Sequence, residues 1–417
     1  MKDILFEEFI KPERWKAEID IAFYKGINKG MLKKLVNPDI RAAVCLQIYR
    51  REYEISPPRT QQIPKDNGKF RTVYINMGLD RIILSLINNI LFDMCPDWIH
   101  PSCTSYQKGI GTGKVVREVS NWIVKGRNNQ VGYKTDLSKY FDSVPIKEID
   151  LVFDKLEARF GDSCIIDLLR KYYHSDWCFD LQGNLIQHYQ SLKQGCATAS
   201  FLANVLLYDI DKTMTEICKG QYVRYSDDML FIVRHQAKAM KTLMEMLEEK
   251  GLTLNPDKIE PVQKNRWVKF LGFSIKGDKI TLSKNRLKKL QKEIERRTIN
   301  NPKATPKSAL NAINYYLYKQ KWCYATSVLS VVNCERDIDE INKFILDCLR
   351  AVETGKKRIG GLGYEHHKDG VITRGRGRNV KANREKTGRI DGYYTVKCMW
   401  KNIQTNKAVF EAVVRQM

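Results

Sequence analysis

The sequence predicts an α+β fold in which helices alternate with short antiparallel hairpins, followed by a helical region and a basic tail. Turn-forming residues separate paired strand-like runs in several places before residue 235. Apolar residues at helical spacing fill the intervals between these runs and continue to about residue 352. From Gly355 onward, Lys and Arg are interleaved with Gly. We therefore expect a body of helices and antiparallel strands with a cationic extension.

Composition narrows the class of protein. The chain has 417 residues, of which 43% are hydrophobic, so we expect two or three globular domains rather than a disordered chain. Lys and Arg number 71 against 48 Asp and Glu, and the net charge of +23 predicts a polyanionic partner, most simply nucleic acid. No run approaches the roughly 20 apolar residues of a membrane helix, so no membrane partner is expected. The 11 cysteines form no CxxC pair, which argues against a zinc site or disulfide framework and favours a reducing, cytoplasmic setting.

The N-terminal part is predicted to be helical. Apolar residues recur at helical spacing through the first 50 residues, and a second helix is expected over 38–48. A hairpin follows over 63–75, because Asp66-Asn67-Gly68 separates two extended runs. Alternation places two of its cations on one face. Its cations either grip a triphosphate or form a solvated basic hairpin, and both interpretations stay open; they are Lys65, Lys69 and Arg71.

Further helices and a second hairpin are expected in the middle of the chain. Residues 80–95 are predicted to form a mostly buried helix with Asp80 as its N-cap, and residues 146–173 one long helix. Trp177–Tyr189 is predicted to form a hairpin that turns at Gln182-Gly183-Asn184. A loop with Gln194 and Gly195 then opens a helix over 201–212. This loop either lets backbone and amide approach a nucleotide closely or simply caps the helix.

Three acids stand at the ends of predicted strands. An apolar strand ends at Asp136, and Asp227 and Asp228 form the tip of a hairpin over 221–232. An Asp-Asp pair alone is usually an ordinary solvated turn. If the strand end faces the hairpin tip, Asp136 and Asp227 are placed to share two Mg²⁺ ions about 3.5–4 Å apart, as in enzymes of in-line phosphoryl displacement. One ion would activate a primer 3′-hydroxyl, and the other would steady a triphosphate and its leaving pyrophosphate.

Six segments, taken in order, resemble the sequence blocks of reverse transcriptases. The blocks are IPKDNGKFR from residue 63, TDLSKYFDSVP from 135, LKQGCATASFLANVLL from 192, YSDD from 225, LNPDK from 254 and KFLGF from 269. The resemblance covers about residues 55–275 and implies a right-hand polymerase. Its parts would be an N-terminal helical segment over 1–54, fingers and palm with an antiparallel sheet over 55–275, a helical thumb over 276–352 and a basic extension over 353–417.

The resemblance also implies a role for each matching position. The catalytic acids would be Asp136, Asp227 and Asp228. Two Mg²⁺ ions would be held by Asp136, Leu137, Asp227 and Asp228. Incoming dNTPs would be contacted by Lys65, Lys69, Arg71, Phe141, Gln194, Gly195 and Lys258. Phe141 would stack under the sugar and reject a 2′-hydroxyl, and Arg71 would hold the triphosphate. Lys258 would protonate pyrophosphate, unless it is an ordinary surface lysine, and Phe270–Phe273 would form the primer-grip turn.

The C-terminal third is expected to bind nucleic acid. Helices are predicted over 283–298, 304–319 and 337–352, and the first is strongly basic, which suits a thumb on a duplex or an ordinary solvated face. A final helix from Lys401 to the end either docks on the body or mediates self-association into a homo-oligomer. In the extension, contacts to RNA are expected from Arg374, Arg376, Arg378, Lys381 and Arg384.

Several features separate this chain from other reverse transcriptases. We find no nuclease-like extension, no RNase H region after the thumb, and neither the NAxxH nor the VTG pattern of retron enzymes. Gln194-Gly195 is intact, unlike the corresponding block of diversity-generating enzymes. The chain is therefore most similar to stand-alone bacterial defence-associated reverse transcriptases. That resemblance implies an RNA-directed DNA polymerase that makes cDNA from a structured noncoding RNA in antiphage defence. Two alternatives stay open: template-independent or homopolymer synthesis at the same site, and a non-catalytic RNA-binding or maturation protein.

Overall fold

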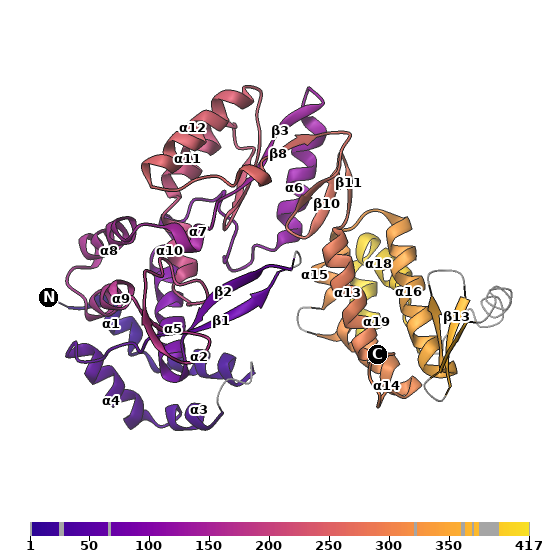
Figure 1. Cartoon of the computed structure of the whole chain (residues 1–417), viewed down its shortest axis with the longest axis horizontal. Coiled ribbons are helices and arrows are strands. Elements are labelled where there is room, and N and C mark those ends of the chain that lie inside the picture. Colours follow the sequence, from indigo (N-terminus) through magenta and orange to yellow (C-terminus); the bar gives the residue numbers. More distant parts are fainter. Residues whose placement is uncertain are drawn as a thin grey trace. The chain divides into compact units, whose positions relative to one another are not determined.

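The computed structural model describes most of the chain, namely residues 2–24, 29–65, 68–320, 323–359, 363–368, 371–374 and 392–416. The chain divides into two compact units, whose helices and strands are labelled in Figure 1. The first unit consists of Met1–Lys108 and Val131–Pro261, and the second of Gly109–Gln130 and Val262–Met417. Both units contain helices and antiparallel strands, which confirms the predicted α+β class. The division into 1–54, 55–275, 276–352 and 353–417 stays a prediction.

The first unit begins with helices, as predicted for residues 1–50. They are α1 (Ile4–Phe9), α2 (Pro12–Tyr24), α3 (Lys29–Leu35) and α4 (Pro38–Tyr49). The side chain of Asp3 caps α1, and that of Asn37 caps α4. Helices α1 and α2 pack against α5 (Gly78–Met94) and bury Leu5, Phe9 and Trp15 (Figure 1). These apolar residues are the ones whose spacing predicts the helices.

Helix α5 starts earlier than the sequence predicts, and Asp80 is not its N-cap. The N-cap position belongs to Met77, whose side chain makes no capping bond. Asp80 is instead buried in the first turn, where its carboxylate accepts hydrogen bonds from Tyr53 Oη at 2.7 Å and Ser56 N at 3.1 Å. A buried carboxylate needs such partners. Asp80 therefore anchors the extended segment that leads into the first strand.

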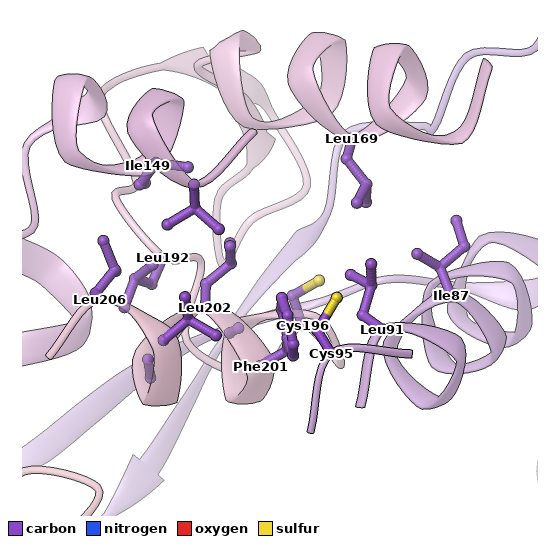
Figure 2. Packing of buried hydrophobic residues seen from close by; sticks show 14 of the residues in the cluster. Ile87, Leu91, Cys95, Ile149, Leu169, Leu192, Cys196, Phe201, Leu202 and Leu206 are labelled. Atoms are coloured by element: carbon purple, nitrogen blue, oxygen red, sulfur yellow. The ribbon is translucent and has the colours of Figure 1, made fainter. Parts of the chain in front are cut away.

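The core of the first unit lies between α5 and helices from the middle of the chain. These helices are α7 (Tyr140–Ser143), α8 (Ile146–Phe160), α9 (Cys164–His174), α10 (Ala199–Val205), α11 (Tyr208–Ile217) and α12 (Gln236–Glu249). Figure 2 shows Leu91 and Cys95 beside Cys196 and Phe201. Phe92 meets Phe201 edge-on, with ring centroids 5.5 Å apart. The side chains drawn in Figure 2 are apolar. A hydrogen bond also joins the two helices, because Ser200 Oγ on α10 donates to Asn88 Oδ1 on α5 at 3.0 Å.

Two predicted helices are each broken in two. The predicted helix over 146–173 is interrupted at Gly161, whose φ of +78° ends α8, and Ser163 then caps α9. The predicted helix over 201–212 is interrupted at Leu207, which has φ −106° and ψ 13° between α10 and α11. Apolar residues continue at helical spacing across both breaks, so periodicity alone does not reveal them.

Both predicted hairpins that precede residue 190 are present, and together they form one sheet of order β2-β1-β4-β5. The strands are β1 (Arg59–Pro64), β2 (Phe70–Ile75), β4 (Trp177–Phe179) and β5 (Leu185–Gln187). Strands β1 and β2 pair antiparallel, as do β4 and β5, and a parallel contact between Arg59 and Phe179 joins the two hairpins. In the first turn, Gly68 has φ +79°, while Asp66 and Asn67 lie outside the described residues.

A second sheet of order β6-β7-β3-β8 positions the candidate site. Its strands are β3 (Gln130–Asp136), β6 (Tyr222–Tyr225), β7 (Asp228–Ile232) and β8 (Glu260–Gln263). Strand β7 runs antiparallel to both β3 and β6. Gly132 is required in β3, because a Cβ there would collide with the backbone of Phe231 on β7. The close approach of these two strands brings their ends together.

The second unit contains a small sheet and a set of helices. Strands β9 (Val268–Phe270), β10 (Phe273–Lys276) and β11 (Lys279–Leu282) form the sheet, and α6 (Thr112–Lys125) packs against it. The helices predicted over 283–298, 304–319 and 337–352 are confirmed in location. They correspond to α13 (Lys284–Arg297), α14 (Pro306–Asn314) with the π-helical turn Tyr315–Lys319, and α16 (Glu335–Thr354). Short helical turns occur at Pro96–Trp98 and Pro256–Lys258 in the first unit, and at Tyr324–Ser327 (α15) and Leu329–Val331 in the second.

The last residues are two helices rather than the one predicted from Lys401. They are α18 (Val396–Thr405) and α19 (Lys407–Gln416), separated by Asn406, which has extended geometry. Helix α18 packs along α16 (Figure 1). Trp400 Nε1 donates to Val332 O at 2.8 Å, and Tyr393 Oη to Asn342 Oδ1 at 3.1 Å. These residues therefore dock on the helical unit. Between them and α16, the structure describes strands β12 (Lys356–Ile359), β13 (Gly363–Lys368) and β14 (Val371–Arg374).

Nowhere in the described part of the chain is a helix both long and apolar enough to cross a membrane. All 11 cysteines are free thiols, and most of them are buried.

Candidate active site

The three predicted acids meet where the second sheet ends. Asp136, the last residue of β3, pairs with Asp228, the first residue of β7. Tyr225 also pairs with Asp228, so Ser226 and Asp227 form a two-residue turn between β6 and β7. Leu137 N donates to Asp227 O at 3.1 Å. The strand end and the hairpin tip are thus joined directly, which is the condition under which Asp136 and Asp227 could share metal ions.

A fully buried ion pair between Arg224 and Asp211 holds this hairpin in place. Arg224 Nη2 lies 2.6 Å from Asp211 Oδ2, and neither side chain has any exposure. Arg224 Nη1 also donates to the carbonyl of Ser226 at 3.1 Å, and Tyr222 Oη donates to Asp211 at 2.9 Å. Ser226 itself has φ +59°, the left-handed geometry that primed two-residue turns require. The turn that carries Asp227 is therefore fixed by a buried charge network.

The carboxylates at the tip share a partly buried, negatively charged environment. Burial raises the pKa of Asp227, and the neighbouring Asp136 raises it further. Burial raises the pKa of Asp228 to about 6, while Lys134 opposes this shift and the other two acids add to it. Lys134 is a buried lysine on β3, with Nζ 4.0 Å from Asp228 and 3.9 Å from Glu260. Burial and the mutual repulsion of the acids thus both disfavour their charged forms.

Lys258 lies directly against Asp136. The turn Pro256–Lys258 is attached to the end of β3 because Asn255 N donates to Asp136 O at 2.8 Å. From this turn, Lys258 Nζ donates to Asp136 Oδ1 at 2.7 Å. The structure therefore brings Lys258 to the acids, as expected if it acts in the site. In this structure the Lys258 ammonium group is the cation that lies beside the Asp136 carboxylate.

The acids fit a divalent cation in chemistry. Carboxylate oxygens are the ligands that Mg²⁺ prefers. A bound cation would favour the charged forms of Asp227 and Asp228, which burial and, to a smaller extent, the neighbouring acids disfavour. As the side chains lie, the described residues include no group of three or more His, Cys, Asp or Glu close enough to hold a metal. The ion pair between Lys258 and Asp136 is consistent with this, since Lys258 engages one of the required oxygens.

The basic hairpin contributes one cation to this neighbourhood. Lys65, Lys69 and Arg71 are exposed. The positive charge of Arg71 lowers the pKa of Asp227, against the larger effect of burial. Burial raises the pKa of Asp142, while Lys139, Lys65 and Arg71 lower it, in that order of size. Of the three predicted cations, Arg71 thus acts electrostatically on the hairpin that carries Asp227. Asp142 was not among the predicted site residues, because no sequence pattern singles it out.

The loop of Gln194 and Gly195 is tied to both the basic hairpin and Phe141. Tyr74 N on β2 donates to Gln194 O at 2.7 Å, and Leu192 N donates to Phe141 O at 3.2 Å. Gly195 has φ +110°, and a Cβ there would lie 2.9 Å from Tyr74 O, so only glycine fits this contact. The nucleotide-contacting residues predicted from separate blocks are therefore linked through backbone bonds.

Sequence reasoning missed Lys193. This lysine is buried and has φ +51°, and its Nζ donates to Ser175 O at 2.7 Å and Gln190 Oε1 at 2.9 Å. Burial lowers the pKa of Lys193 to about 8. It also lies over the ring of Tyr172, 5.0 Å from the centroid. The only signal in the sequence is a charged residue inside an otherwise apolar and small-residue loop, which is more typical of an exposed side chain.

Other predicted residues lie in the second unit or outside the described residues. Phe270–Phe273 forms the turn between β9 and β10, in which Leu271 and Gly272 have φ +49° and +79°. Arg374 is the last residue of β14. The remaining predicted RNA contacts lie outside the described residues; they are Arg376, Arg378, Lys381 and Arg384.

An antiparallel sheet that presents acids at a hairpin tip, surrounded by helices, is the arrangement of a nucleic-acid polymerase palm. The model of the reverse transcriptase (RNA-dependent DNA polymerase) family matches residues 63–275, half of the chain. The chain therefore belongs to the reverse transcriptase family. Protein YkfC of Escherichia coli K12 is 26% identical over 306 residues, which cover 60% of this chain and 74% of that protein.

Solved structures of telomerases are also similar. Apo telomerase from Candida tropicalis, truncated from its C-terminal domain, has a TM-score of 0.40 and 15% identity, and covers 55% of this chain and 56% of its own. Telomerase from Candida albicans, in complex with a fragment of telomeric RNA, has a TM-score of 0.39 and 13% identity, and covers 73% of this chain and 60% of its own. This chain spans less than two thirds of these telomerase chains.

Proposed function

We propose that this protein is an RNA-directed DNA polymerase that copies a structured noncoding partner RNA into cDNA from dNTPs. The observation that carries the proposal is the convergence of Asp136 with Asp227 and Asp228 at one sheet end. Family membership supports the chemistry. The net charge of +23 supports a nucleic-acid partner. A role in antiphage defence and a cytoplasmic setting belong to the same proposal, and the free thiols support the latter.

In this proposal, Asp136, Leu137, Asp227 and Asp228 hold two Mg²⁺ ions. When bound, these ions would supply the positive charge that activates a primer 3′-hydroxyl and neutralises the leaving pyrophosphate. Asp136 would exchange its contact with Lys258 for this role, which frees the Lys258 ammonium to protonate the leaving group. Arg71, together with Lys65 and Lys69, would hold the triphosphate from the basic hairpin.

The remaining contacts would select and orient the nucleotide. Phe141 is half-buried and held by Tyr140, with ring centroids 5.5 Å apart. An aromatic side chain fixed in this way would clash with a 2′-hydroxyl and so favour dNTPs over rNTPs. Gln194 and Gly195 would contact the nucleotide or template through the loop that Tyr74 holds in place.

The proposal is tested by replacing one acid of the hairpin. Asp227→Asn keeps the size of the side chain but removes its charge, so we expect DNA synthesis with Mg²⁺, dNTPs and co-purified RNA to fall by about a thousandfold or more. Asp257→Asn, an exposed acid in the turn that carries Lys258, is the matched control and should retain activity. RNA binding should be unchanged in both variants.

Full synthesis by Asp227→Asn would refute the proposed site. Sequencing the DNA product then separates templated copying from the alternative chemistry: a product complementary to the co-purified RNA supports the proposal, whereas a homopolymer indicates template-independent addition at the same site. Biological activity that survives Asp227→Asn would favour a non-catalytic RNA-binding protein.

A further inference from the structure

The hairpin formed by β4 and β5 is an exposed apolar element that the proposed polymerase chemistry does not use. Residues 181–189 are all exposed. Three large apolar side chains in this range are exposed: Leu181 by 54%, Leu185 by 50% and Ile186 by 37%. Trp177, at the start of β4, is 43% exposed. Exposed apolar clusters mark sites of interaction with other macromolecules.

The hairpin also lacks positive charge. Residues 176–190 contain Asp176 and Asp180 but neither Lys nor Arg, in a chain whose net charge is +23. The other hairpin of the same sheet is different, because its exposed Phe70 lies between Lys69 and Arg71. Nucleic acid is therefore expected at the first hairpin and not at the second. Arg59 of β1 lies over the ring of Phe179 on β4, 5.6 Å from its centroid, but the edge strand β5 carries no cation. Two copies of so cationic a chain repel each other least where cations are few, so a second copy fits best at β5.

The backbone of β5 also has hydrogen-bonding groups on its outer side that a further strand could pair with. Among the strands that the structure describes, β5 is the last in its sheet. Asp180 N donates to Asn184 O, and His188 N donates to Asp176 O, both at 2.9 Å. By the alternation of an antiparallel ladder, Ile186 then bonds to β4, whereas the N–H and C=O groups of Leu185 and Gln187 point away from it. An edge of this kind is a template for a further strand.

We propose that β5 pairs with β5 of a second copy of this chain around a two-fold axis at Ile186. Antiparallel pairing about this axis sets Leu185 opposite Gln187 of the second copy, so the outward N–H and C=O groups of each residue meet those of the other. The two Ile186 side chains then lie side by side. Leu185 lies on the opposite face of the hairpin from Ile186, together with Trp177 of β4, so apolar side chains flank the junction on both faces. This self-association goes beyond the proposed polymerase function and does not depend on it.

Sedimentation velocity of the full-length protein tests the proposal, after nuclease treatment and at high salt to remove bound RNA. We expect a dimer that dissociates on dilution. Leu185→Lys places a charge from each copy in the contact and should raise the dissociation constant by about tenfold or more. Leu151→Lys is the matched control, since Leu151 lies on α8 outside the hairpin, is 56% exposed, and should leave the dimer unchanged.

Cross-linking tests the two-fold axis itself. Facing residues at non-hydrogen-bonded positions have Cα atoms about 4.5 Å apart, within the reach of a disulfide. Ile186→Cys should therefore give an intermolecular disulfide on mild oxidation, in a Cys398→Ser background that removes the exposed native thiol. Leu151→Cys should not. A protein that is monomeric at all concentrations, a dimer insensitive to Leu185→Lys, or a dimer that disappears on nuclease treatment would each overturn the proposal, the last by showing that RNA joins the copies.

Discussion

Lys193 shows how a single buried residue can set the geometry of a whole loop. Its ammonium group binds the carbonyl of Ser175, just before the β4–β5 hairpin, and the side chain of Gln190, just after it. Its own backbone is left-handed and leads directly into Gln194. A charged clamp of this kind holds the base of the hairpin and the start of the loop together. The cost of burying the charge explains why the pKa of Lys193 falls to about 8.

This clamp predicts a dependence of stability on pH. An unfolded lysine has a pKa of about 10.4, so between pH 8 and 10.4 the unfolded chain holds a proton that native Lys193 has released. Stability attributable to Lys193 therefore rises with pH across this window. Relative to Lys193→Met, the free energy of unfolding of the wild type should gain about 2–3 kcal/mol between pH 7.5 and 10.5, measured by chemical denaturation.

The control for this prediction is Lys171→Met, which removes an exposed lysine of α9. Its difference from the wild type should stay constant over the same pH range. Nearby acidic groups, namely Asp176, Cys178 and Cys196, offset only part of the effect of burial on Lys193. Parallel stability curves for wild type and Lys193→Met would show that the lysine is not desolvated. In synthesis assays, Lys193→Met should raise the KM for dNTPs more than it lowers kcat, because it acts through the position of Gln194.

At the scale of elements, the hairpin over β6 and β7 depends on the pair formed by Arg224 and Asp211. Removing one member of a fully buried pair leaves an uncompensated charge in the core. We expect Arg224→Met to lower the free energy of unfolding by about 3–5 kcal/mol, measured by denaturant titration. Lys241→Met, which breaks an exposed pair with Glu245 on α12, should cost less than about 1 kcal/mol.

A double variant separates stability from positioning. Replacing both partners, as Arg224→Met with Asp211→Leu, removes the unpaired charge and should restore much of the stability. DNA synthesis should not recover, because the bond from Arg224 to the carbonyl of Ser226 is still missing. A double variant that is stable and fully active would show that the pair contributes only to the core.

Helices and strands could be predicted from the sequence where particular residue types favour one backbone conformation, as in the turns of the hairpins. Gly68, Gly183 and the Ser226-Asp227 turn mark the hairpins, because turn chemistry is local. The breaks at Gly161 and Leu207 were not predicted, because apolar periodicity continues through them. Asp80 was misplaced for a similar reason: an acid near a helix start is usually a cap, whereas here Tyr53 and Ser56 bury it.

The site was predictable in part. The meeting of Asp136 with Asp227 follows from the two strand ends, and Lys258 lies beside them. The supporting network did not follow from the sequence. Lys134, Lys193 and the pair of Arg224 with Asp211 are charged residues in buried positions, and sequence patterns assign such residues to the surface. Only the packing shows that Lys134 lies beside Asp228 and that Arg224 holds the turn before Asp227.

At the scale of the whole molecule, the basic extension divides at Gly392. Residues 392–416 belong to the second unit, since Asn314 Nδ2 donates to Gly392 O and Tyr318 Oη to Tyr394 O, both at 2.8 Å. Residues 356–391 contain 11 Lys and Arg against four acids. A truncation that ran to residue 400 would therefore remove the cations and also half of α18, and would confuse RNA binding with folding. To separate RNA binding from folding, the segment must be replaced in a way that leaves α18 and α19 intact.

Such a replacement tests whether the extension binds RNA. Gly355 follows the end of α16, and Tyr393 binds Asn342 about 12 residues, or roughly 20 Å, back along that helix. A Gly-Ser linker of about 14 residues spans this distance in place of 356–391. If these cations touch phosphate, the logarithmic salt dependence of binding to single-stranded RNA should flatten by about 0.7 for each phosphate that the linker variant no longer neutralises. A scrambled 356–391 segment keeps the charge and should keep the slope, whereas an unchanged slope with the Gly-Ser linker would place the RNA-binding cations elsewhere in the chain.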